Sequence, residues 1–366
     1  MKGILYLEDG TVFRGKGFGA PGTKVGELVF NTSMTGYQRI MTDPSYSEQI
    51  ITMTYPLQGN YGVNDTDNES DRIHAFGMVV KDLCQKPSNW ACTKTLDEWL
   101  KEQNVPGVYD VDTRDITSKL RDEGNMKCVI SNENKSLDEL KELCANTELR
   151  GDQMKNAGTD HEYEIKADPE KFRVAVLDLG VKKSILDELV KRGCSLRVFP
   201  YGTKAKNILA MKPDGVFITN GPGDPSEAKE EILITEKLIT NSNYGENQMP
   251  IMGVCMGHQM IALACGGKTF KLKYGHRGGN HGVFDKLTGR SYIVSQNHGY
   301  AVDSGSVILK GLDVTHLNLN DGTVEGMQHI RKPVFSVQFH PEAKPGPNDT
   351  GYLFDRFIDL MKGGRL

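Results

Sequence analysis

The sequence predicts an α/β protein with two unlike domains, a β-rich α+β domain over residues 1–150 and a doubly wound, mostly parallel α/β domain over residues 171–366. Two observations predict this division. From residue 172 onward, short apolar strands alternate with amphipathic helices, which is typical of a parallel sheet. The first 150 residues instead hold short β-prone runs separated by Gly, Pro, Asn and Asp turns. Residues 151–170 are polar and charge-rich, and we interpret them as a linker.

The N-terminal domain offers two convincing helices. One spans residues 95–103, and the other begins at a Thr113 cap and ends near Gly124. Nothing in residues 1–150 has the spacing of a metal site, a phosphate-binding loop or a catalytic triad. From its residues alone, we therefore expect this domain to bind or dock a partner.

The C-terminal domain is expected to place its ligand site at one edge of the sheet. Strands are predicted at residues 172–179, 195–200, 215–219 and 250–254, and helices at residues 181–192, 204–211, 226–240 and from Cys255 to Gly266. Residues 268–340 are richer in strands, and Ser226 and Asn348 are expected to cap helices. Ligands bind outside the carboxyl ends of such strands. The loops after residues 219 and 254 are therefore the first candidates.

The composition narrows the range of partners and compartments. A net charge of −4 and a pI near 6.2 lack the basic signature of a nucleic-acid-binding protein. No apolar run approaches the roughly 18 residues that a membrane helix requires. Seven scattered cysteines without a Cys-x-x-Cys pair favour a reducing compartment, and early acidic residues argue against a signal peptide. We expect a cytoplasmic protein without nucleic-acid or membrane partners.

Cys255 is the leading candidate for a nucleophile. It lies between an apolar strand and a helix, with Gly253 and Gly257 two residues away on either side. This is the cysteine form of a nucleophile elbow, in which glycines make room for a sharp turn. The N-terminus of the following helix would favour the reactive thiolate. The alternative is a buried structural cysteine, which is the commoner role of a free cysteine.

His340 and Glu342 are the expected partners of Cys255. They end an alternating, β-prone run, and residues two apart in an extended chain face the same side. Pro341 between them favours that extended conformation. His340 would act as base and then acid, while Glu342 would hold its tautomer. His258 is a competing base three residues after Cys255, although packing is the better interpretation of its position.

Two features could stabilise an oxyanion. One is the backbone N–H of Met256, the residue that follows the nucleophile. The other is the loop Asn220-Gly-Pro-Gly-Asp-Pro225, whose glycines let backbone amides approach a ligand closely. By itself this loop could be an ordinary strand-to-helix turn.

Together these motifs resemble the class I, or triad, glutamine amidotransferases, whose pattern is Gly-Pro-Gly-Asp-Pro, Gly-x-Cys-x-Gly-His-Gln and His-Pro-Glu in that chain order. The N-terminal half is similar to the small subunit of carbamoyl-phosphate synthetase. The runs that carry this similarity are residues 25–38, 42–51, 54–62 and 112–114, followed by residues 270–281 and 295–302. The resemblance covers nearly the whole chain and is more specific than the triad motifs alone.

The resemblance implies a glutaminase. Glutamine would be hydrolysed through a γ-glutamyl thioester, and ammonia would pass to a large subunit in a heterodimer. That subunit would bind ATP and magnesium and make carbamoyl phosphate from bicarbonate, so neither cofactor nor metal is expected on this chain. Position by position, glutamine contacts are expected at Ser45, Gly221, Gly223, Met256, Gln259, Asn297, Gly299 and Tyr300.

Other functions are considered beside this one. A subunit for anthranilate or GMP synthesis would share the triad, but the N-terminal 150 residues argue against it. A non-catalytic scaffold would not need an intact triad, and a cysteine peptidase would not need the 220–225 loop. His276 and His281 could be metal ligands, yet neither lies in a recognised ligand spacing, so a structural role is favoured.

Overall fold

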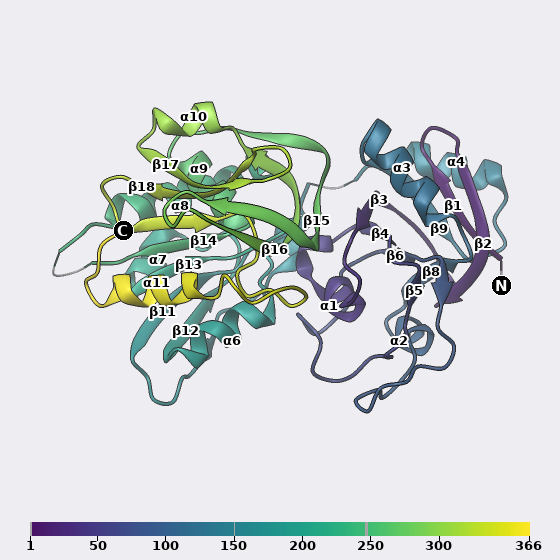
Figure 1. Cartoon of the computed structure of the whole chain (residues 1–366), viewed down its shortest axis with the longest axis horizontal. Coiled ribbons are helices and arrows are strands. Elements are labelled where there is room, and N and C mark those ends of the chain that lie inside the picture. The colour runs from purple at the N-terminus through teal and green to yellow at the C-terminus, as the bar shows by residue number, and fades with distance from the viewer. Residues whose placement is uncertain (1, 150, 246–247) are drawn as a thin grey trace. The chain divides into compact units, whose positions relative to one another are not determined.

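The computed structural model describes residues 2–149, 151–245 and 248–366, and the chain forms two compact units (Figure 1). The first unit combines residues up to 150 with Lys273–Arg277. The second unit combines Gly151–Leu272 with Gly278–Leu366. A short segment from the second half of the sequence therefore belongs to the first unit.

The first unit is organised around a closed β-barrel. In order around the barrel, its strands are β1 (Lys2–Leu7), β2 (Val12–Gly19), β8 (Pro106–Tyr109), β6 (Gly77–Val79), β4 (Gln49–Met53), β3 (Thr23–Asn31) and β9 (Met126–Ser131). Side chains alternate between the two faces of each strand. On β1, Leu5 and Leu7 join one apolar core, whereas Ile4 and Tyr6 join another that includes Leu140. The alternation lets one strand serve two cores.

Short helices and a two-stranded sheet complete this unit. They are α1 (Tyr37–Thr42), the 3-10 helix η1 (Pro44–Tyr46), β5 (Leu57–Gln58), β7 (Asp82–Leu83), α2 (Leu96–Glu102), α3 (Thr113–Glu123) and α4 (Leu137–Asn146). The cap expected at Thr113 is wrong by one residue. Asp112 caps α3, because its Oδ1 accepts the N–H groups of Arg114 and Asp115 at 3.1 and 3.0 Å. A carboxylate there satisfies two helix donors and complements the helix dipole.

The second unit contains a ten-stranded sheet with a parallel centre. Its strands, in spatial order, are β10 (Tyr163–Ile165), β12 (Cys194–Phe199), β11 (Phe172–Leu177), β13 (Gly215–Ile218), β14 (Ile251–Val254), β19 (Val334–Val337), β18 (Val324–His329), β16 (Arg290–Val302), β15 (Thr269–Asp285) and β17 (Leu312–Asn318). Pairing is parallel from β12 through to β19, whereas β10 and β18 join antiparallel. The predicted fold class is confirmed.

Helices cover both faces of the parallel strands, as a doubly wound sheet requires. The helices of this unit are α5 (Gln153–Ala157), α6 (Lys183–Lys191), α7 (Ala205–Ala210), the 3-10 helix η2 (Pro225–Glu227), α8 (Lys229–Asn241), α9 (Met256–Ala264), α10 (Ser304–Ile308) and α11 (Tyr352–Met361). On β11, Val174 and Val176 pack with apolar residues of α6 and α11. The alternate residues, Ala175 and Leu177, pack with those of α7, α8 and α9.

Some local details differ from the sequence expectations. Residues 151–170 contain α5 and β10, and β10 pairs with β12 as part of the sheet. Ser226 lies inside η2, whose cap is Asp224, and α8 begins only at Lys229. Asn348 does not cap α11 either, since this helix begins after Gly351. In these cases the Asp, Asn and Ser side chains or carbonyls support turns that precede the helix.

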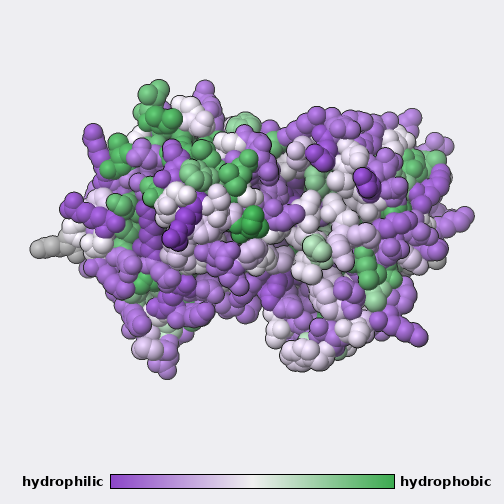
Figure 2. Space-filling model, viewed as in Figure 1, coloured by the Kyte–Doolittle hydropathy of each residue, from purple (hydrophilic) through white to green (hydrophobic). Residues whose placement is uncertain are grey.

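The face of the molecule seen in Figure 2 is mostly hydrophilic, with local apolar patches. One patch lies over α10, where Ile308 and the adjoining Leu309 are 63% and 88% exposed. Across the described part of the chain, the helices are all too short or too polar to traverse a lipid bilayer.

Candidate active site

Cys255 joins β14 to α9 in an unusual backbone conformation, with φ 53° and ψ −101°. A non-glycine residue held at positive φ stores strain and is a candidate functional position. Its N–H donates to the carbonyl oxygen of Val337 on β19 at 2.9 Å, which ties the turn to the next strand. The strand, strained turn and helix form the elbow geometry that presents a nucleophile at the edge of a sheet.

Gly253 and Gly257 provide the space that this turn needs. A Cβ atom on Gly257 would lie 2.2 Å from the carbonyl oxygen of Ile218, and one on Gly253 would lie 2.7 Å from the carbonyl group of Gly257. The N–H of Gly257 also donates to the Thr219 carbonyl oxygen at 2.9 Å. The elbow therefore packs directly on the end of β13, and any side chain at position 257 would push it away.

The Cys255 thiol is buried beside hydrogen-bonding groups. Its side chain is only 2% exposed, and Sγ lies 3.5 Å from the carbonyl oxygen of Asn297, to which the protonated thiol can donate. Met256 supplies the first N–H of α9, for which no earlier helical turn provides an acceptor.

The loop at residues 220–225 lies beside the elbow. It follows β13, which pairs in parallel with β14, so both segments leave the sheet at the same edge. A Cβ atom on Gly221 would lie 2.3 Å from the Leu179 carbonyl oxygen, and Gly223 has φ +92°. Both positions thus require glycine, and the loop presents backbone rather than side chains.

His340 and Glu342 face each other as expected from their spacing. Nδ1 of His340 lies 2.6 Å from Oε1 of Glu342, and both side chains are almost fully buried. An ionised Glu342 accepts only, so Nδ1 donates and the other ring nitrogen is directed elsewhere. Within the described ranges, Oε2 of Glu342 has no hydrogen-bond partner, and the Cys255 side chain is the second neighbour of the His340 ring, where it helps to raise the pKa of the imidazole. Nε2 is thus the ring nitrogen that can serve a reacting group.

Lys182 is a third buried partner that the sequence analysis missed. Its Nζ donates to Oε1 of Glu342 at 2.9 Å and to the carbonyl oxygen of Ala343 at 2.9 Å. Lys182 lies just before α6, and its side chain is only 3% exposed. A buried lysine is uncommon unless it is paired. The pairing could not be read locally, because Lys182 and Glu342 are 160 positions apart.

Neighbouring charges shift the pKa values of His340 and Glu342. Burial opposes the charged form of His340, yet the negative charge of Glu342 raises the pKa of the imidazole above its usual range. Burial also opposes ionisation of Glu342, but the cations of Lys182 and His340 lower the pKa of its carboxyl. The directions of these shifts favour an imidazolium–carboxylate pair, with the amino group of Lys182 beside the carboxylate.

His258 does not have the environment of a base. Its Nδ1 lies 3.0 Å from Oγ of Ser336, and the side chain is fully buried. Burial lowers the pKa of His258 to about 3, so the ring is neutral and part of the packing beneath the elbow. This favours His340 over His258 as the partner of Cys255.

Comparison with known proteins matches both halves of the chain. The model of the carbamoyl-phosphate synthase small chain, CPSase domain, matches residues 5–130, and that of the class-I glutamine amidotransferases matches residues 175–360. The carbamoyl phosphate synthase small chain of Clostridium acetobutylicum is 53% identical over 98% of this chain and 100% of its own length. The chain belongs to the carbamoyl-phosphate synthase small chain family.

Other members of this family are similar over comparable lengths. The small chain of Fusobacterium nucleatum is 51% identical over 97% of this chain and 96% of its own. The chloroplastic small chain of Oryza sativa subsp. japonica is 45% identical over 99% of this chain and 82% of its own. Both halves of the molecule therefore follow the family pattern.

Most of the expected glutamine contacts lie in the second unit of the chain. The structure places Gly221 and Gly223 on the loop after β13, Met256 and Gln259 on α9, and Asn297, Gly299 and Tyr300 on β16. Two of them are joined directly, since Nε2 of Gln259 donates to the carbonyl oxygen of Tyr300 at 2.7 Å. Ser45 lies in the first unit, buried in η1, where its N–H donates to Oδ1 of Asp43 at 2.9 Å.

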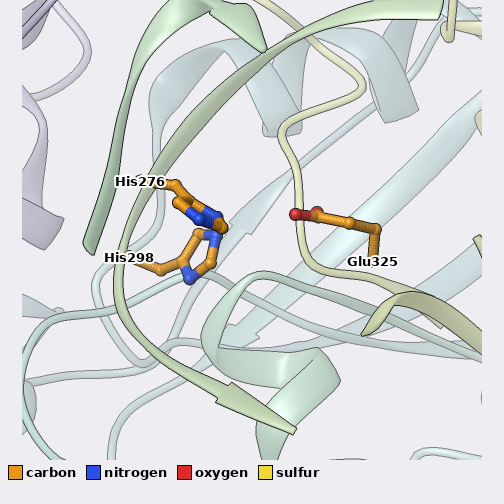
Figure 3. A group of neighbouring side chains, drawn as sticks. All are labelled: His276, His298 and Glu325. Carbon is orange, nitrogen blue, oxygen red and sulfur yellow. The ribbon is translucent and has the colours of Figure 1, made fainter. Parts of the chain in front are cut away.

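Figure 3 shows three buried side chains with metal-ligand chemistry, His276, His298 and Glu325. Within the second unit, both ring nitrogens of His298 already lie beside oxygens. Nδ1 is 2.7 Å from the Tyr300 carbonyl oxygen and Nε2 is 2.6 Å from Oε1 of Gln296. Oε1 of Glu325 accepts from Gln296. These partners fit a hydrogen-bonded network, and we assign no metal to it.

Proposed function

We propose that this chain is the glutaminase subunit of a glutamine-hydrolysing carbamoyl-phosphate synthetase. In this proposal, Cys255 attacks the side-chain amide of glutamine, and the resulting ammonia passes to a large subunit that makes carbamoyl phosphate from bicarbonate with ATP and magnesium. The single observation that carries the chemistry is the strained elbow of Cys255, tied through its N–H to Val337 just ahead of the paired His340 and Glu342.

The reaction would proceed in two stages. The Cys255 thiolate forms a bond to the amide carbon, and the N–H of Met256 and an N–H of the 220–225 loop receive the oxyanion. The imidazolium of His340 then protonates the leaving nitrogen, which departs as ammonia and leaves a γ-glutamyl thioester. His340, now neutral, takes a proton from water, which attacks the thioester and releases glutamate and the thiolate.

Glu342 and Lys182 would act on this chemistry through His340. Glu342 holds Nδ1–H, so that Nε2 faces the reacting groups, and stabilises the imidazolium. Lys182 keeps Glu342 ionised and fixes the position of its Oε1. The eight glutamine contacts inferred from the family remain part of this proposal.

The central test combines the chain with its large subunit and replaces the nucleophile. Cys255→Ser should abolish carbamoyl phosphate synthesis from glutamine and leave synthesis from added ammonia near the parental rate. Mass spectrometry of the parental complex quenched during turnover should find the γ-glutamyl adduct on Cys255. Glutamine turnover at the parental rate by the Ser variant, or an adduct on another cysteine, would refute the assignment.

A partner interaction is the proposed role of the first unit. Residues 1–150 carry no triad or cofactor motif, and free ammonia would be protonated if it were released into neutral water. We infer that residues 1–150 dock the large subunit and that docking raises the glutaminase rate. Size-exclusion chromatography of a chain lacking these residues should show loss of the complex, and tight binding by the truncated chain would contradict the docking role.

The seven free cysteines suit a reducing compartment such as the cytoplasm.

A further inference from the structure

We propose that Glu325 is a positioning residue for glutamine binding, which rests on the glutaminase function proposed above. The side chain of Glu325 accepts from Gln296 of β16. It anchors a closed ring of hydrogen bonds that holds the β16 segment from Gln296 to Tyr300. This segment carries the Asn297 carbonyl beside the Cys255 sulfur and several expected glutamine contacts.

The first half of the ring runs through side chains. Oε1 of Glu325 accepts from Nε2 of Gln296 at 2.9 Å, and Oε1 of Gln296 lies 2.6 Å from Nε2 of His298. Nδ1 of His298 lies 2.7 Å from the carbonyl oxygen of Tyr300. Figure 3 shows His298 and Glu325 with their polar ends turned toward the same region. This half connects β18 to β16.

The second half returns to Glu325 through α9 and through Gln338, the residue that follows β19. Nε2 of Gln259 donates both to the Tyr300 carbonyl oxygen at 2.7 Å and to Oε1 of Gln338 at 2.9 Å. The N–H of Gln338 then donates to the carbonyl oxygen of Glu325 at 2.9 Å. Six residues thus form the ring. Glu325 contributes its side chain to one half and its backbone carbonyl to the other.

The side-chain chemistry fixes the direction of the bond between Glu325 and Gln296. Both ring nitrogens of His298 face oxygens, and both can donate only when the ring carries two protons. A carboxylate can only accept, so Glu325 holds the NH₂ group of Gln296 toward itself and leaves the amide oxygen facing His298. Gln296 and Glu325 are at most 1% exposed, so water cannot replace a lost partner easily. The loss of the carboxylate would leave Gln296 free to rotate, and His298 would lose its fixed acceptor.

This arrangement predicts an effect on glutamine affinity more than on the chemical step. The segment from Gln296 to Tyr300 carries expected substrate contacts, whereas the backbone of Cys255 is held by Val337 and the imidazole of His340 by Glu342. In the complex with the large subunit, Glu325→Leu should raise KM for glutamine about tenfold or more, with kcat changed by less than about threefold. Glu325→Gln keeps an oxygen that can accept from Gln296, and should return KM to within about threefold of the parental value.

Asn318 provides a matched control. Its Nδ2 donates to the same Oε1 of Glu325, also at 2.9 Å, and its side chain is 3% exposed, but it lies outside the ring. Asn318→Ala should change KM by less than about threefold. Gln296→Ala breaks the ring without altering Glu325, and should reproduce the KM increase even if Glu325→Leu folds poorly.

The measurements are steady-state kcat and KM for glutamine, with ammonia-dependent synthesis as the check on the complex. A parental KM in Gln296→Ala would overturn the proposal, as would an equal KM increase in Asn318→Ala or no rescue in Glu325→Gln. A fall in kcat at unchanged KM would also overturn it. Failure of the glutaminase function itself would look different, because the parental complex would then lack glutamine-dependent activity.

Discussion

Lys182 and Glu342 form a salt bridge of 2.9 Å between Nζ and Oε1, with side chains that are 3% and 0% exposed. The same Oε1 faces Nδ1 of His340. One carboxylate oxygen thus serves a histidine and an ammonium group, and the other oxygen has no partner within the described part of the chain. Lys182 therefore extends the expected triad by a residue that controls the position and charge of its acid.

Replacement of Lys182 should impair glutamine hydrolysis. Lys182→Met keeps much of the apolar stem but leaves a buried carboxylate with one cation fewer, which is costly. We expect kcat/KM for glutamine to fall about ten- to a hundredfold, as for the loss of a group that orients a catalytic residue. Lys183→Met is the matched control, because the adjacent Lys183 forms an exposed pair with Asp187. Equal losses in both variants would contradict a specific role for Lys182.

The pH profile of kcat/KM for glutamine should move in opposite directions when the charge of Glu342 or that of Lys182, the two beside His340, is removed. Glu342 raises the pKa of His340, so Glu342→Gln should lower it and shift the alkaline limb of kcat/KM to lower pH. Lys182 lowers the pKa of His340, so Lys182→Met should shift that limb to higher pH. Lys182 also lowers the pKa of Glu342, so its loss should move the acid limb upward. Profiles that shift together would rule out this charge arrangement.

The pair of His340 and Glu342 should also stabilise the fold in a defined pH window. Because the pKa of His340 is raised in the folded protein, this residue contributes to the free energy of unfolding. The contribution is complete below the ordinary histidine pKa and is lost as pH rises through the pKa of His340 in the folded protein. The lowered pKa of Glu342 gives stability that is complete above the ordinary glutamate pKa and is lost as pH falls. Thermal unfolding should therefore show the largest deficit of Glu342→Gln near pH 5 to 6, between those ordinary values of about 4.3 and 6.5. A deficit independent of pH would show that packing, not charge, is lost.

His340 should matter more than Glu342 for turnover. His340→Asn removes the proton-transfer group itself, whereas Glu342→Gln removes a group that orients it, and such members contribute unequally. We expect the Asn variant to lose more kcat in the glutaminase assay, with circular dichroism confirming that both variants remain folded. Equal collapse of both folded variants would mean that Glu342 does more than orient the imidazole.

Gly257 should be essential for the elbow. In Gly257→Ala, the new Cβ would lie 2.2 Å from the Ile218 carbonyl oxygen, so the turn must shift. Overpacking of this kind costs about 1–3 kcal/mol of unfolding free energy. Gly305→Ala is a suitable control, since its Cβ would meet only Oδ1 of Asp303 at 3.5 Å. Thermal unfolding and the rate of Cys255 alkylation should change in the first variant only, and unchanged alkylation there would argue against a strained elbow.

Short-range features of this protein could be determined from its sequence. The alternation of apolar strands and amphipathic helices predicted the doubly wound sheet, because burial on both faces imposes a local pattern. The glycines around Cys255 predicted the elbow, and the spacing of His340 and Glu342 predicted their pairing, since each depends on a few neighbouring residues. The assignment of glutamine contacts came from family resemblance rather than from these patterns.

Long-range features were decided only by the tertiary structure. Lys182 precedes a helix and Glu342 follows a distant strand, so their contact depends on how the chain orders the strands of the sheet. The closure of the first unit into a barrel and the ring through Glu325 depend on the same kind of packing. The cap at Asp112 was missed for a related reason, because several adjacent polar side chains could begin that helix and only the folded backbone selects one. Local patterns fix which elements form, whereas contacts between residues far apart in sequence follow from how those elements pack.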